Sequence, residues 1–266
     1  MSTVPNAPSD HIRGVLDKVP AVTLFFWLIK VMATTVGETG ADFLIFNLKL
    51  GLANTSLLAA VVLLVVLVLQ VRAPRYIPWM YWLTVVLISI VGTLITDNLT
   101  DNLGVRLEVS TGVFAIALAT LFGVWYAREH TLSIHSIYTR PRELFYWAAI
   151  LVTFALGTAA GDLVGERWAL GYLVSGLIFA GLIAAVAVAY YVFKLDGVLA
   201  FWLAYILTRP LGASFGDLLS QSRKDGGLGF GTTTTSLVFL VIILVLVTYL
   251  SVTRRDVMTP GNGHTA

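Results

Sequence analysis

Apolar runs alternate with short polar breaks along the whole chain. Eight such runs lie near residues 21–46, 53–71, 78–101, 111–127, 144–165, 170–193, 197–219 and 233–252. A helix needs about 20 predominantly apolar residues to cross the hydrocarbon core of a bilayer, which is roughly 30 Å thick, and each run is close to that length. The breaks leave no room for a soluble domain. The pattern therefore predicts an all-α membrane protein with eight transmembrane helices.

The composition agrees with a membrane protein and excludes several other classes. Hydrophobic residues make up 58% of the chain and charged residues 12%, against about 45–50% and 25% in soluble domains. This excludes an ordinary soluble enzyme. No basic block is dense enough to hold a phosphate backbone, so we expect no nucleic-acid partner. The chain has no cysteine, which excludes disulfides and thiolate metal sites.

Lys and Arg are unevenly divided between the two sides of the predicted membrane. Ten lie on the side of the N-terminus and five on the opposite side. Because cytoplasmic loops are enriched in these residues, we expect both termini in the cytoplasm. The chain then divides into a cytoplasmic N-terminal segment (1–20), a first membrane half (21–127), a cytoplasmic linker (128–143), a second membrane half (144–252) and a cytoplasmic tail (253–266). The N-terminal segment lacks the apolar core of a signal peptide, so we expect the first helix to direct insertion.

A sequence motif recurs in every second apolar run. Each copy begins with an aromatic residue followed by Trp: Phe26-Trp27, Tyr81-Trp82, Tyr146-Trp147 and Phe201-Trp202. Ten residues after each Trp stands a glycine, and fifteen residues after it an aspartate: Gly37, Gly92, Gly157 and Gly212, then Asp42, Asp97, Asp162 and Asp217. Such self-similarity indicates duplication. Because each unit contains two helices, we expect four parallel two-helix repeats, two in each half, around a pseudo-fourfold or nested pseudo-twofold axis.

Every ionisable residue predicted inside the membrane lies on the helices that carry this motif. The set contains seven acids and two bases: Glu38, Asp42, Asp97, Asp101, Asp162, Glu166 and Asp217, with Lys30 and Arg209. A charge at the bilayer centre costs about 2.5–3.5 kcal/mol on the mildest scale. We therefore expect these four helices to line the interior, with their polar residues in one stripe per helix, while the other four face lipid.

The excess of acids points to cation or proton handling. Fully ionised, the nine side chains carry a net charge near −5, and clustered carboxylates in a low-dielectric space retain protons or bind a cation. Carboxylates and hydroxyls are hard ligands that suit Mg, Ca or Mn, while Na⁺ and a proton stay open. We assign the seven acids as metal ligands, the two bases as counter-ions, and five hydroxyls as groups that support the site: Thr34, Thr93, Thr158, Thr208 and Ser214. An alternative is that these groups form interhelical pairs that only lock the bundle.

Small residues and aromatic residues have simpler interpretations. The four repeated glycines permit either close helix packing or a local break of the helix. Pro210 favours a kink, because proline lacks an N–H and its ring clashes with the preceding turn. We interpret the four aromatic-Trp pairs as anchors at the membrane interface, because they lie near the predicted cytoplasmic ends of their helices.

Three runs resemble a known bacterial family. They are TTVGET at residues 34–39, GTAAGD at residues 157–162 and LTRPLGASFGD at residues 207–217. The sequence is similar, over nearly its whole length, to an inner-membrane family built from a repeat of unknown function and historically labelled a membrane-anchored, predicted regulator of amylopullulanase. The resemblance implies a multi-pass protein of the bacterial inner membrane and supplies no mechanism. The acid pairs are also similar in style to motifs of bacterial cation and manganese exporters, which is an analogy only.

Three functions are compatible with these features. We favour a secondary transporter, an exporter, for a hard divalent cation, with Mn²⁺ favoured and a ring of carboxylates as its ligands. The first alternative is a proton-coupled carrier of a small organic solute, and the second is a membrane sensor or scaffold that transports nothing. We expect no enzyme, because no nucleophile and base pair is recognisable, and no cofactor. The expected partners are the bilayer and a metal ion or proton, and homo-oligomerisation stays open.

Overall fold

The computed structural model describes residues 18–257, and within them all regular structure is helical. The described part contains eight long helices, namely α2 (Leu24–Asp42), α3 (Gly51–Arg72), α4 (Pro78–Asp97), α5 (Leu107–Glu129), α6 (Arg140–Asp162), α7 (Gly171–Tyr191), α8 (Gly197–Ser220) and α9 (Thr232–Thr253). Each coincides with one predicted apolar run. All except α2, which carries three charged residues, are long and apolar enough to cross a membrane. The helices are those of a multi-pass membrane protein.

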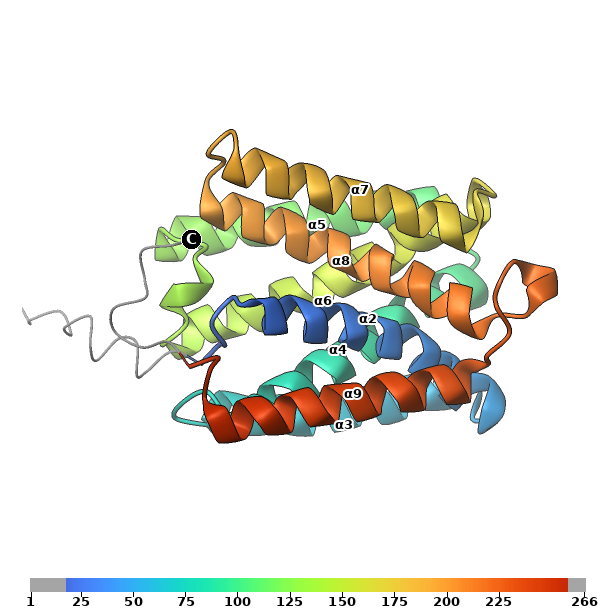
Figure 1. Cartoon of the computed structure of the whole chain (residues 1–266), viewed down its shortest axis with the longest axis horizontal. Helices are drawn as coiled ribbons and strands as arrows, with labels where there is room; N and C mark the ends of the chain where they lie inside the picture. The colour runs from blue at the N-terminus through green and yellow to red at the C-terminus, as the bar shows by residue number, and fades with distance from the viewer. Residues whose placement is uncertain (1–17, 258–266) are drawn as a thin grey trace, which may run out of the picture.

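Five short helical segments join or extend the long helices. Three are π-helical and follow directly on α2, α4 and α6, each beginning at the residue after the repeated aspartate: η1 (Phe43–Asn47), η2 (Asn98–Asn102) and η4 (Leu163–Arg167). The other two are 3-10 turns in connecting loops, η3 (Ile134–Ser136) and η5 (Arg223–Asp225). The π-helical segments lie at the end of the bundle opposite to η3 (Figure 1).

The four motif-bearing helices form a closed inner ring. Helix α2 packs against α4, α4 against α6, α6 against α8, and α8 back against α2. The remaining helices form an outer layer, and each packs against the inner helix that follows it in the chain: α3 against α4, α5 against α6 and α7 against α8. Helix α9, at the end of the chain, packs against α2 at its beginning (Figure 1).

Burial separates the inner helices from the outer ones. In the most apolar stretch of α4, α6 and α8, 61–67% of the residues are buried, against 11–28% in the four outer helices. The outer surface carries large apolar side chains, such as Leu64 on α3 and Leu244 on α9. The prediction that the charged helices line the interior is therefore confirmed.

The aromatic-Trp pairs form a layer inside the ring, at the end where the inner helices begin. The first ring of each pair contacts the Trp of the next inner helix, with centroids 5.4–6.2 Å apart: Phe26 with Trp82, Tyr81 with Trp147, Tyr146 with Trp202, and Phe201 with Trp27. The Tyr81 and Tyr146 hydroxyls also share a hydrogen bond. The interpretation of the pairs as interfacial anchors was wrong for Trp82, Trp147 and Trp202, which are only 1–3% exposed. They face neighbouring inner helices, so they close this end of the interior.

The four repeated glycines lie where neighbouring inner helices approach most closely. Each meets the residue seven positions after the Trp of the next inner helix: Gly37 meets Ser89, Gly92 meets Phe154, Gly157 meets Arg209, and Gly212 meets Thr34. A Cβ atom at any of them would come within 1.8–2.6 Å of that side chain. The α-helix continues through all four glycines and through Pro210. These residues serve close packing in the structure, and no helix breaks at them.

Replacement of an inner glycine tests this packing. We expect Gly92→Ala to destabilise the protein by about 1–3 kcal/mol, because the new methyl group overlaps Phe154 Cβ at 2.6 Å and lies against the α6 backbone. Gly181→Ala in α7 is the matched control, since a Cβ there meets no atom within 4 Å, and alanine favours a helix over glycine by about 1 kcal/mol. Thermal unfolding in detergent measures both. Equal melting temperatures for the two variants would contradict the packing.

A buried ion pair fixes the end of the bundle where the inner helices begin. Lys18 Nζ lies 2.6 Å from Glu143 Oε2 and donates a second hydrogen bond to the Val71 carbonyl oxygen at 3.0 Å. Glu143 is 1% exposed. The pair therefore joins the segment before α2 to the start of α6 and the end of α3.

Removal of one partner from this ion pair is expected to be costly. Glu143→Ala leaves the Lys18 ammonium buried without a counter-charge, and such a loss costs about 3–5 kcal/mol. Arg106→Ala is the control, because the Arg106–Glu108 pair is exposed and such pairs contribute at most about 1 kcal/mol. Thermal unfolding should show a large decrease in melting temperature only for the first variant, and a similar decrease for both would refute the role of the pair.

Candidate functional site

The Arg209 guanidinium lies at the centre of the inner ring and contacts all three other inner helices. Its Nη2 donates hydrogen bonds to Glu38 Oε2 on α2 at 2.7 Å, to Thr158 Oγ1 on α6 at 2.8 Å, and to Thr93 Oγ1 on α4. Its Nη1 donates to the Thr34 carbonyl oxygen at 3.3 Å. Arg209 is fully buried and Glu38 is 8% exposed. We call these five residues the central cluster.

The repeat register explains how the central cluster is assembled. Glu38, Thr93 and Thr158 occupy one position of the motif, eleven residues after the Trp, and the fourth copy has Ala213 there. Arg209 comes seven residues after its Trp, on the same helix as that alanine. Three copies therefore contribute oxygen atoms to one level of the ring, and the fourth contributes the cation that they bind.

The atoms around the guanidinium are all hard oxygen ligands. They comprise one carboxylate, two hydroxyls and one backbone carbonyl, the donor types that hold hard metal cations in proteins. Arg209 Nε has no hydrogen-bond partner, although it is buried. The centre of the ring is thus an oxygen-lined cation site in which the side chain of α8 supplies the cation.

Lys30 lies in an apolar environment, apart from the acids. Its Nζ is 4.2 Å from the centroid of the Phe154 ring and 4.1 Å from that of Tyr205. The residue is fully buried, and Nζ has no hydrogen-bond partner. Two aromatic rings face it in place of an acid. Of the two predicted counter-ions, only Arg209 is paired with an acid in the described part of the chain.

The repeated aspartates lie at the far ends of the inner helices, directly before the π-helical segments. Asp217 is 8% exposed, Asp42, Asp97 and Asp162 are partly exposed, and Gln221 Nε2 donates a hydrogen bond to Asp42 Oδ2 at 3.3 Å. Asp101 and Glu166, two further predicted ligands, are exposed at the rim. Within residues 18–257, no three His, Asp or Glu side chains lie close enough to hold one metal ion. The acids therefore lie beyond the central cluster, at the end of the bundle opposite to the aromatic layer.

The predicted supporting hydroxyls have different positions. Thr93 and Thr158 belong to the central cluster. Thr34 Oγ1 donates to the Thr208 carbonyl oxygen at 3.2 Å and so joins α2 to α8. Ser214 Oγ donates to Ser175 Oγ on α7 at 3.0 Å and lies away from the cluster.

Three features of the site are not indicated by the sequence. The π-helical segments after three of the aspartates follow no recognisable residue pattern, although such segments are rare and often occur at functional sites. Gln221, which contacts Asp42, stands outside the repeated motif. The partners of Lys30 also depend on the order of helices around the ring, which the sequence alone left open.

A double-mutant cycle tests the central ion pair. Arg209→Gln leaves the Glu38 carboxylate buried without its counter-charge, and we expect a loss of about 3–5 kcal/mol in the free energy of unfolding. Arg209→Gln combined with Glu38→Gln removes both charges and should cost less than the single variant. Thermal unfolding in detergent provides the measurement. Additive losses from the two substitutions would show that the charges do not interact.

Comparison with known families identifies the repeat. A family model described as "Repeat of Unknown Function (DUF347)" matches residues 25–76, 80–131, 145–196 and 200–256. Each matched segment covers one inner helix and the outer helix that follows it. Neither a curated protein nor a solved structure matches the chain.

Proposed function

The chain belongs to the family built from the Repeat of Unknown Function (DUF347), and because that description names no activity, we propose a function from the site itself: secondary transport of a hard divalent cation, in the direction of export and with Mn²⁺ favoured. The observation that carries the proposal is the oxygen cage around Arg209, with Glu38 as its charged member.

The proposal includes the placement of the chain in the membrane. We propose that all eight long helices cross the inner membrane of a bacterium, as four parallel two-helix repeats around a pseudo-fourfold axis, with both termini in the cytoplasm. The cyclic packing of outer on inner helices supports the symmetry, and the excess of Lys and Arg supports the orientation. Helix α2 spans the bilayer despite its charges, because its neighbours shield them from lipid.

The proposed transport step is an exchange of cations at Glu38. For export, a cation enters from the cytoplasmic end, once the aromatic layer around Trp82 and Trp147 has separated. It displaces the guanidinium of Arg209 from the Glu38 carboxylate and takes over the hydroxyl and carbonyl oxygens of the cage. In the second half of the cycle the aromatic layer is closed and the cation leaves past the aspartates at the opposite end, so that only one side is open at a time.

The ligand chemistry supports a hard cation. Carboxylate, hydroxyl and carbonyl oxygens suit Mg, Ca and Mn, whereas Cu and Zn are favoured by sulfur and imidazole ligands. The chain has no cysteine, and His130 and His135, the two histidines in the described part, lie outside the long helices.

One observation favours a second candidate, a proton-coupled carrier of a small organic solute. No three acids of residues 18–257 converge on a single ion position, and separated carboxylates in a protein interior suit a proton relay. In this alternative Arg209 leaves Glu38 when that carboxylate is protonated and binds an anionic group of the solute instead.

Flux measurements with matched variants distinguish the two candidates. We expect Glu38→Gln, and Asp97→Asn together with Asp162→Asn, to reduce Mn²⁺ flux into proteoliposomes about 10-fold or more, since a lost charged ligand costs about 1.5–3 kcal/mol. Glu108→Gln on the exposed surface of α5 is the control and should retain full flux.

The opposite results are equally informative. Unchanged Mn²⁺ flux in both inner variants would remove the cation assignment. Acidification of the vesicle interior that depends on an organic solute, and that no divalent metal inhibits, would establish the proton-coupled carrier in its place.

A further inference from the structure

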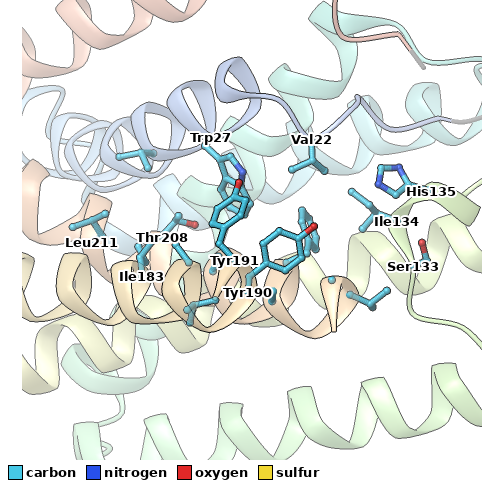
Figure 2. Close-up of a pocket in the computed structure, with 18 residues that line it drawn as sticks. Val22, Trp27, Ser133, Ile134, His135, Ile183, Tyr190, Tyr191, Thr208 and Leu211 are labelled. Atoms are coloured by element: carbon cyan, nitrogen blue, oxygen red, sulfur yellow. The ribbon is translucent and has the colours of Figure 1, made fainter. Parts of the chain in front are cut away.

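A cavity of about 480 Å³ lies outside the inner ring, between α2, α7 and α8. It is separate from the central cluster, and its volume falls in the range of ligand pockets, about 300–1,000 Å³. Its walls are Trp27 and Val31 of α2, the face of α8 from Gly197 to Leu211, and the face of α7 from Ile183 to Tyr191. The η3 turn closes one end. We call this cavity the lateral groove (Figure 2).

The outer helices differ in how far they cover the next inner helix. Helix α9 contacts not only α2 but also α4, the next inner helix, and α3 likewise contacts α6 in addition to α4. Helix α7 packs firmly on α8 but makes no comparable contact with α2, and α5 makes no comparable contact with α8. Between α7 and α2 the space stays open as the lateral groove.

The lining of the lateral groove is mostly apolar, with the Tyr190 and Tyr191 side chains midway and further polar side chains at one end. Figure 2 shows His135 of η3 and the preceding Ser133 at one end and Leu211 at the other, with Trp27 and the Tyr190 ring between them. Thr208 lies near the apolar end, but its hydroxyl already donates to the Tyr205 carbonyl oxygen at 2.7 Å, so it requires no polar ligand. This arrangement fits an amphipathic molecule with its polar group at η3.

The surroundings of the groove indicate which molecule this is. The adjoining surface of α7 exposes large apolar side chains such as Leu182 and Val188, so in a bilayer the groove opens to hydrocarbon. From Gly197 to Leu211, α8 rises about 21 Å, which exceeds the roughly 15 Å of hydrocarbon in one leaflet. The groove is therefore long enough to accommodate an acyl chain of a lipid in that leaflet over the full depth of the leaflet.

The excess of basic residues on the side of η3 favours an anionic headgroup. The loops and helix ends on this side contain nine Lys and Arg residues but four Asp and Glu in the described part of the chain. One of the nine is Lys194, which is exposed and stands three residues before Gly197 of the groove wall. Basic residues at this depth attract anionic lipid headgroups.

We propose that the lateral groove binds one anionic phospholipid, with an acyl chain along α8 and the headgroup between η3 and Lys194. The lipid would fill the gap between α7 and α2. It would thereby support the contact of α2 with α8, which the bonds from Thr34 to Thr208 and from Thr35 to Gly212 maintain on the inner side. This inference concerns a second site and holds whatever the central cluster transports.

Lipid retention by groove variants tests the proposal. Ala187→Trp and Ala204→Trp place an indole ring in the groove, while Ala119→Trp on the exposed face of α5 is the control. Each protein is reconstituted with phosphatidylglycerol and phosphatidylcholine in equal amounts, and lipid retained after mild detergent extraction is counted by native mass spectrometry. We expect one retained phosphatidylglycerol in the parent and the control, and at least about a tenfold loss in the groove variants. Equal retention in all four proteins would overturn the proposal.

Two further measurements do not depend on the folding of the tryptophan variants. Lys194→Ala should retain lipid but lose the preference for phosphatidylglycerol over phosphatidylcholine, and an unchanged preference would overturn the assignment of the headgroup. The unaltered protein can also be labelled with a phospholipid that carries a photoreactive group in its acyl chain. We expect label on residues 183–191 and 198–211, and label confined to α3, α5 and α9 would overturn the position of the chain.

Discussion

The buried pair of Arg209 and Glu38 determines how the rest of this protein is built. An ionised side chain in hydrocarbon costs several kcal/mol unless it is paired and shielded, and the two residues come from helices far apart in the sequence. The inner helices must therefore meet at one axis so that the pair can form. Four apolar helices must then surround them, because the inner helices carry further ionisable residues, such as Lys30 and Asp217, that cannot face lipid.

A regular repeat with single departures from it produces the site. In each copy the same glycine meets the same position of the next inner helix, and the same aromatic ring meets the next Trp. This regularity positions the backbones. At the position seven residues after the Trp, however, the four copies have Thr34, Ser89, Phe154 and Arg209. The one arginine, together with Ala213 on its own helix, turns a symmetric ring into a site with one cation and three oxygen-bearing partners.

The sequence predicted the parts of this structure that follow from period and polarity. The eight helices follow from the length of each apolar run. The division into inner and outer helices follows from the cost of exposing charge to lipid. Both properties can be read from the sequence of each helix alone. Features that depend on which helices become neighbours were not predictable. Lys30 was expected to balance an acid and instead lies against Phe154 and Tyr205. Trp82, Trp147 and Trp202 were expected at the interface, yet the packing of the helices buries them.

The contact that holds the central charge also connects the two ends of the interior. Arg209 is fixed by Glu38 on α2, and α2 and α8 are joined further by the Thr34 and Thr35 hydroxyls. On the same two helices, Phe26 and Phe201 close the aromatic layer. Release of the guanidinium would remove a charged hydrogen bond between α2 and α8. Because the aromatic layer involves the same helix pair, the central charge pair and the closed end of the interior are mechanically connected.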